Sequence, residues 1–148
     1  MEPSKGFFDM LAIARENVRQ NPNLVNADTT EIVFRYLRGI KDEVDEVSDE
    51  VKVDNDVYLT DELSDIAWDY AVLLALLEER GYVTSAEQVL THGLQKYTER
   101  TPAFRAGNAV LWEDIKTRQK EVLRKRHTEK YNQYLSVATL PSEPYYSI

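Results

Sequence analysis

The chain has 148 residues, of which 43% are hydrophobic and 30% charged, a composition typical of one globular domain and not of a disordered chain. It has no cysteine, which excludes a disulfide framework, a zinc–thiolate site and a thiolate nucleophile. The formal net charge of -8 argues against a nucleic-acid binder, because phosphate backbones select basic surfaces. No apolar run reaches the ~18 residues that span a bilayer, and the N-terminus lacks the order of a secretion signal. We therefore expect a cytoplasmic protein that binds neither nucleic acid nor membrane.

Two amphipathic helices are predicted in the first fifty residues. The first spans about 4–20, and an Asn-Pro-Asn sequence ends it. The second begins near Asp28, where residues 28–31 have the form of a capping box, and runs to about residue 51. Each should bury one face. The apolar residues at helical spacing are Phe7, Leu11, Ala14 and Val18 in the first helix, and Val33, Tyr36, Leu37, Ile40, Val44, Val47 and Val51 in the second.

The third predicted helix is the most apolar. A turn centred on Asp54 precedes it, Thr60 is the expected N-cap, and the helix spans about 61–80 before Gly81. Its apolar residues occupy more than one side, so we expect it to be central or to lie in a subunit interface.

Two further helices complete an all-α prediction. Residues 84–87 form a second capping box that opens a helix to about Arg100, and Pro102 and Gly107 mark the break after it. A long basic helix follows from Asn108. We predict one all-α domain over 1–140, a helical bundle built around an antiparallel hairpin with a long C-terminal helix, and an extended tail over 141–148.

Two pairs of acidic residues flank the predicted turn, Glu43 with Glu46 and Glu62 with Asp65. Residues three apart share a helix face. Glu43 and Asp65 each lie eleven residues from Asp54, and Glu46 and Glu62 each lie eight. Two antiparallel helices would therefore bring all four carboxylates to one level, where they repel one another unless a cation lies among them. This predicts a site for a hard divalent ion, Mg²⁺ first and Mn²⁺ as the alternative.

The acidic residues also raise the questions of a further ligand, a di-iron site and a calcium-binding loop. Glu50 is a candidate further ligand, or it merely extends the acidic face. A di-iron site needs Glu-x-x-His on two helices, whereas Val89 and Arg124 stand three residues before the two histidines. A calcium loop starting at Asp54 would need glycine at its sixth position and glutamate at its twelfth, where Leu59 and Asp65 stand. The residues alone leave two interpretations open, a magnesium site and a solvated acidic helix face.

The acidic motifs, with two basic motifs after them, resemble the MazG nucleotide pyrophosphohydrolases. The resemblance covers about residues 31–121 and departs from the family at Asp42, where glutamate is usual, and in the basic extension and tail. The matching motifs are Asp42-Glu43-Val-Asp-Glu46, Glu62-Leu-Ser-Asp65, Lys96-Tyr-Thr-Glu-Arg100 and Trp112-Glu-Asp-Ile-Lys116.

This resemblance implies an all-α enzyme that cleaves a nucleoside triphosphate to the monophosphate and pyrophosphate. By the same resemblance, Lys96 and Arg100 would hold phosphate oxygens, and Trp112 and Lys116 would contact the nucleotide. The family's oligomers imply a homodimer or homotetramer. The ligands and catalytic carboxylates implied are Glu43, Glu46, Glu62 and Asp65.

A second class of function is a non-catalytic interaction module. In that case the acidic face would bind a basic partner, and the basic C-terminal helix an acidic one. Taken alone, Lys96 and Arg100 are an exposed surface pair by spacing, and a single Trp112 is more typical of a core than of a base platform.

Overall fold

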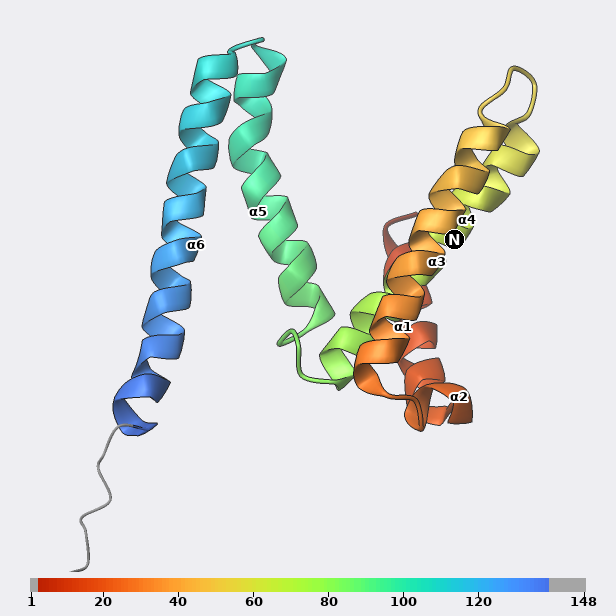
Figure 1. Ribbon diagram of the computed structural model, residues 1–148. Helices are drawn as coiled ribbons and strands as arrows, with labels where there is room; N and C mark the ends of the chain where they lie inside the picture. The colour runs from red at the N-terminus through yellow and green to blue at the C-terminus, as the bar shows by residue number, and fades with distance from the viewer. Residues whose placement is uncertain (1–2, 139–148) are drawn as a thin grey trace, which may run out of the picture. The chain divides into compact units, whose positions relative to one another are not determined.

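The computed structural model describes residues 3–138, and within that range every regular element is a helix (Figure 1). The predicted all-α class is confirmed. The chain divides into two compact units, residues 1–90 and residues 91–148. The helices are α1 (Pro3–Gln20), α2 (Pro22–Val25), α3 (Thr29–Glu50), α4 (Asp56–Glu79), α5 (Ala86–Arg105) and α6 (Ala109–Ala138).

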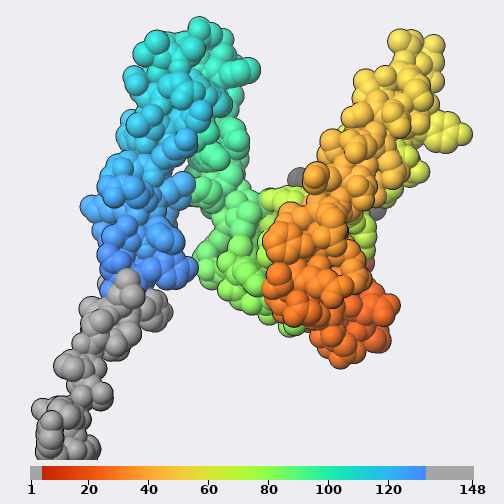
Figure 2. Space-filling view, in the orientation of Figure 1, coloured from red at the N-terminus to blue at the C-terminus, as the bar shows by residue number. Residues whose placement is uncertain are grey.

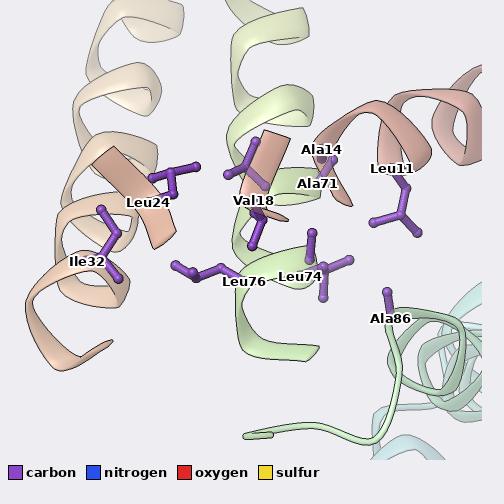
Figure 3. Close-up of a cluster of buried hydrophobic side chains, with 11 residues drawn as sticks. Leu11, Ala14, Val18, Leu24, Ile32, Ala71, Leu74, Leu76 and Ala86 are labelled. Carbon is purple, nitrogen blue, oxygen red and sulfur yellow. The ribbon is translucent and has the colours of Figure 1, made fainter. Parts of the chain in front are cut away.

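The core of residues 1–90 forms where α1 packs along the second half of α4 (Figure 3). The α1 stripe supplies Leu11, Ala14 and Val18 to this core, as its spacing predicts. Helix α4 supplies the unbroken run 71–76, which is buried on all sides. The expectation that the most apolar helix is central is therefore confirmed. Leu24, Ile32 and Ala86 close the core from the neighbouring segments.

Helices α3 and α4 form an antiparallel hairpin (Figure 1). Asp28 caps α3 as predicted, because its Oδ1 accepts a hydrogen bond of 2.9 Å from the Glu31 backbone N–H. The predicted start of the next helix was wrong. Helix α4 begins at Asp56, five residues before the expected position, so Thr60 lies inside it. The reversal needs only the segment 51–55, in which Asp54 takes a φ of 59°, a conformation that aspartate tolerates better than most residues.

The apolar stripe of α3 is not buried as a whole, which corrects the sequence-based expectation. Leu37 is 41% exposed, Val44 48% and Val51, which follows the end of α3, 67%, whereas the fully buried residue of α3 is Ile32, which does not belong to the predicted stripe. The physical reason lies in the length of the hairpin. Its turn end projects beyond α1 and α2 (Figure 2), so no third helix of this unit covers the stripe there.

Residues 91–138 consist of the larger part of α5 and the whole of α6. Helix α5 runs through Pro102 to Arg105 and does not end near Arg100 as predicted. Its cap is Ser85, whose Oγ accepts from the Gln88 N–H at 3.1 Å. Helix α6 starts after Asn108 as expected, with Asn108 Oδ1 accepting from the Leu111 N–H. None of the described helices is both long and apolar enough to cross a membrane.

Two predictions on the limits of the domain stay untested. The proposed tail, 141–148, lies outside the described residues. The single domain over 1–140 likewise remains a prediction.

An ion-pair network centred on Arg15 ties α1 to α4 and to the first turn of α5. The guanidinium donates to both carboxylate oxygens of Glu78 at 2.9 and 2.7 Å, and to Glu87 at 2.7 Å. Glu78 also accepts from the Ala86 backbone N–H at 2.7 Å. Hydrogen bonding to Arg15 lowers the pKa of Glu78 and is the first cause that lowers the pKa of Glu87 to about 2.

Replacing Arg15 by methionine should lower the free energy of unfolding by about 2 kcal/mol at pH 7, because charge-assisted hydrogen bonds to a half-buried carboxylate are lost. Both carboxyl groups have lowered pKa values in the folded state, so their contribution is present above their ordinary pKa of 4.5 and is lost toward pH 2. The difference in the free energy of unfolding between the wild type and the variant should therefore shrink as the pH falls from 4.5 toward 2. Urea unfolding followed by circular dichroism measures it.

The matched control is Arg19→Met on the same helix. Its partner is Glu79, and both side chains are about half exposed, so its loss should cost roughly 0.5 kcal/mol or less. Equal destabilisation by the two substitutions would contradict the special role of Arg15.

Candidate functional site

Three carboxylates meet on the α3–α4 hairpin. Glu43 from α3 and Glu62 and Asp65 from α4 each offer an oxygen, and these atoms all lie within 4.8 Å of one another. No other such group was found among the described residues. The helical spacing explains the convergence, because Glu62 and Asp65 share one face of α4 and that face lies against α3. We call these three residues the carboxylate cluster.

The electrostatics of the cluster favour a cation. Partial burial raises the pKa of Glu43, and the next causes are the nearby charges of Glu46 and Asp65. The pKa of Glu62 is raised in the same order, first by desolvation and then by Glu46 and Asp65. Each charge therefore makes its neighbour harder to ionise. A bound divalent ion would reverse the sign of this interaction.

Glu46 and Glu50 are placed differently from the three members of the cluster. Glu46 raises the pKa of both Glu43 and Glu62, but its oxygen atoms do not belong to the group within 4.8 Å. Glu50 accepts a hydrogen bond of 2.5 Å from Asn55 at the turn and pairs with Lys52 at 3.6 Å. Three of the four predicted ligands thus come together, while Glu50 is engaged in closing the turn.

Asp69 is an acidic residue of this region that the sequence analysis missed. A Cβ on Gly39 would lie 2.9 Å from Asp69 Oδ2, so the absent side chain of that glycine lets the carboxylate approach α3. Burial is the first cause that raises the pKa of Asp69, and Asp65 is the second. Asp69 could have been found from sequence, because Gly39 and Asp69 each lie fifteen residues from Asp54, in the register predicted for the acidic pairs.

The donor set of the cluster fits a hard divalent ion. It consists only of carboxylate oxygens on two helices, with no histidine among them. Such oxygen ligands suit Mg²⁺, Ca²⁺ or Mn²⁺, whereas zinc and iron sites usually include nitrogen or sulfur ligands. Mg²⁺ usually keeps several waters and takes the remaining oxygens from substrate phosphates, so three protein ligands are sufficient for it.

Arg100 lies at the centre of the predicted basic motifs, all of which belong to residues 91–138. It is only 7% exposed, and its Nε donates to Gln119 Oε1 at 2.7 Å. Its guanidinium carbon lies 5.6 Å from the centre of the Trp112 ring and 5.8 Å from that of Tyr97. It is therefore not the exposed surface residue that spacing alone indicates.

The other three predicted substrate contacts do not all line the same cavity as Arg100. Lys96, Arg100 and Lys116 line one cavity of about 550 Å³ between α5 and α6. Trp112 is half-buried; it packs against Phe104, with ring centres 5.7 Å apart, and lines a separate hollow at the α5–α6 turn. The structure brings three of the four to one cavity and links Trp112 to it through Arg100.

A comparison with protein families matches residues 34–104 to the MazG nucleotide pyrophosphohydrolase domain. The matched segment contains the whole carboxylate cluster together with Lys96 and Arg100, and it ends before Trp112 and Lys116. Neither the curated proteins nor the solved structures yielded a match. The resemblance read from the motifs is thus confirmed by a match to the MazG nucleotide pyrophosphohydrolase domain over residues 34–104 of this chain.

Proposed function

We propose that this protein is a magnesium-dependent nucleotide pyrophosphohydrolase that converts a nucleoside or deoxynucleoside triphosphate to the monophosphate and pyrophosphate. The observation that carries the proposal is the carboxylate cluster, which lies inside the segment matched to the MazG domain. The family match suggests nucleotide pyrophosphohydrolase activity, and the cluster adds a chemically suitable cation site. A cytoplasmic location, where nucleotides and Mg²⁺ are both available, is part of the proposal.

Glu43, Glu62 and Asp65 would hold the ion, whereas Glu46, the fourth ligand predicted from the sequence, lies outside this group of three. Mn²⁺ would suit the same oxygens. When bound, Mg²⁺ would polarise the phosphoryl group and lower the pKa of a coordinated water. The packing of α3 against α4 sets the spacing of the two helices. The carboxylate cluster, which draws on both helices, would therefore hold the ion in a fixed position.

The remaining roles fall to side chains that do not belong to the cluster. Glu46 stands close enough to influence Glu43 and Glu62 yet apart from the three oxygens, which suits a general base that takes the proton of the attacking water. The water oxygen would bond to the α- or the β-phosphorus as the bond from that phosphorus to the oxygen bridging the two breaks, and the products would be the monophosphate and pyrophosphate. Lys96 and Arg100 would compensate the phosphate charge, and Lys116 and Trp112 would contact the nucleotide.

We also propose that the active form is a homo-oligomer, a homodimer or a homotetramer. Phe34, Leu37 and Val44 on α3, and Val51 just after its end, are all exposed and follow one another at spacings of three or seven residues. Residues so spaced share a helix face. A second copy of the same hairpin offers an apolar stripe of matching pitch, and packing two stripes together would remove them from water.

The substitutions Glu62→Gln and Asp65→Asn should each reduce Mg²⁺-dependent pyrophosphate release by at least about 100-fold, which is the upper end of the cost of losing an outer-shell partner. The measurement is pyrophosphate released from a panel of the eight common ribo- and deoxyribonucleoside triphosphates. Circular dichroism should show an unchanged helix content.

Asp45→Asn is the matched control for these variants, because Asp45 is exposed on the same hairpin and is not part of the cluster. It should retain activity within about twofold of the wild type. An active Glu62→Gln protein would contradict the assignment of the cluster.

Mg²⁺ should raise the melting temperature of the wild-type protein even without a nucleotide, because the ion relieves repulsion that exists only in the folded state. At a free concentration 100 times its Kd, a ligand adds about 2.7 kcal/mol to the stability. The shift should be absent in Glu62→Gln and in the wild type with NaCl of equal ionic strength. If Mg²⁺ gave no shift and no nucleotide were hydrolysed, the interaction-module function would be favoured instead.

Light scattering should give the wild-type protein a mass of at least twice the 17.2 kDa of one chain. Adding charges by Phe34→Asp and Leu37→Asp should shift it toward the monomer, since two buried carboxylates would oppose the contact. Ile13→Asp is the control, because Ile13 is 59% exposed on α1. A monomeric wild type would overturn the homo-oligomer.

A further inference from the structure

The cavity between α5 and α6 carries an unusual charge for an acidic protein. Residues 1–90 contain 8 Lys and Arg against 20 Asp and Glu, a net charge of -12, whereas residues 91–148 contain 10 against 6, a net charge of +4. Six cationic side chains line the cavity and only one acidic side chain, Glu99, does so. The six are Lys96, Arg100, Lys116, Arg118, Lys120 and Arg126.

The single acid of the cavity is already compensated. Glu99 forms an ion pair with Arg118 and accepts a hydrogen bond of 2.5 Å from Gln119. Hydrogen bonding to Gln119 is the first cause that lowers the pKa of Glu99. Lys116 is partly compensated as well, by Glu113 at 3.2 Å. The other four cations of the cavity form no ion pair with the carboxylates that the structure describes.

Arg100 is the strongest indication that the cavity receives an anion. It is 7% exposed, and its one hydrogen bond among the described residues goes to the neutral Gln119. Contacts with the Tyr97 and Trp112 rings stabilise its charge only partly. The nearest carboxylate influence is Glu99, whose pKa is lowered first by the hydrogen bond from Gln119 and also by the charge of Arg100, but Glu99 already forms an ion pair with Arg118. Burying a cation without a carboxylate partner of its own is costly, and an anionic ligand would offset that cost.

Lys120 and Arg126 on α6 extend the cationic lining beyond the matched family segment, which ends at residue 104. Their neighbours behave differently. Arg124 pairs with Glu121, and Lys125 pairs with Glu129, and neither Arg124 nor Lys125 lines the cavity. The unpaired charges of this stretch of α6 therefore point to a discrete ligand in the cavity rather than to a uniformly basic helix face.

We propose that the α5–α6 cavity binds a phosphate-bearing small molecule without a metal ion, and that Lys120 and Arg126 contribute to its affinity. Its volume of about 550 Å³ lies in the range of small-molecule sites. Val122 and Leu123 add apolar lining beside the cations, which favours a nucleotide over a bare phosphate. The inference rests on the proposed function for the roles of Lys96 and Arg100, and it adds that Lys120 and Arg126 belong to the same phosphate site and that this site binds without the carboxylate cluster.

Titration calorimetry on the full chain in EDTA tests this inference, with ATP, pyrophosphate and inorganic phosphate as separate probes. ATP should bind the wild type measurably, and the double substitution Lys120→Ala with Arg126→Ala should raise its Kd about tenfold or more, since each lost charged hydrogen bond costs about a factor of ten. The matched double substitution Arg124→Ala with Lys125→Ala removes the same charge from the same helix. It should change the Kd by less than about twofold.

The outcomes separate this inference from the proposed function. Glu62→Gln should bind ATP in EDTA as the wild type does while releasing no pyrophosphate with Mg²⁺. The cavity proposal is overturned if ATP binding requires Mg²⁺, or if both double variants weaken it equally. It is also overturned if a 20-nucleotide single-stranded DNA binds far more tightly than ATP, since that result assigns the basic surface to nucleic acid. If metal-free binding behaves as expected but no nucleotide is hydrolysed, the cavity site stands and the proposed enzyme does not.

Discussion

Mutual repulsion among carboxylates on the α3–α4 hairpin is the constraint around which residues 1–90 are built. Glu43, Glu62 and Asp65 are held within 4.8 Å of one another, and Glu46 and Asp69 add charge beside them. Each carboxylate opposes the ionisation of the next. The hairpin must therefore be held together by something other than the residues of its own site.

The anchor lies at the opposite end of the hairpin. The buried run 71–76 of α4 packs against α1, and Arg15 joins both helices to the start of α5 through Glu78 and Glu87. Burying each large aliphatic side chain of this core contributes about 1.5–3 kcal/mol. The stable end of the hairpin can thus support an acidic end that is unfavourable on its own, an arrangement typical of functional sites.

Local rules were sufficient for most helices and for the core, but not for the exposed stripe of α3. Helical spacing identified Leu11, Ala14 and Val18, and the Asp28 cap was found from its sequence alone. Spacing shows that a face is apolar but not what covers it, so Leu37 and Val44 were expected inside. Pro102 was misjudged because a proline removes only one backbone donor, and α5 continues for three residues beyond it.

The candidate site, like the stripe of α3, could be predicted only in part from helical spacing. Symmetry about Asp54 predicted that acids of α3 and α4 would meet, and that symmetry also relates Gly39 to Asp69. It could not predict that Glu46 would remain outside the group, because Glu43 and Glu46 have the same helical spacing as Glu62 and Asp65, which both belong to the cluster. The burial of Arg100 was likewise beyond sequence, since it depends on Trp112 and Gln119 from the following helix.

The separation of charge along the chain gives the two proposals a common physical basis. In these proposals a cation compensates the acidic cluster, and an anion compensates the α5–α6 cavity with its buried Arg100. A magnesium–triphosphate complex contains both components. Mg²⁺ alone would compensate only the acidic cluster, and the triphosphate alone would compensate only the cationic cavity. We therefore expect metal binding and metal-free nucleotide binding to be separable properties of this protein.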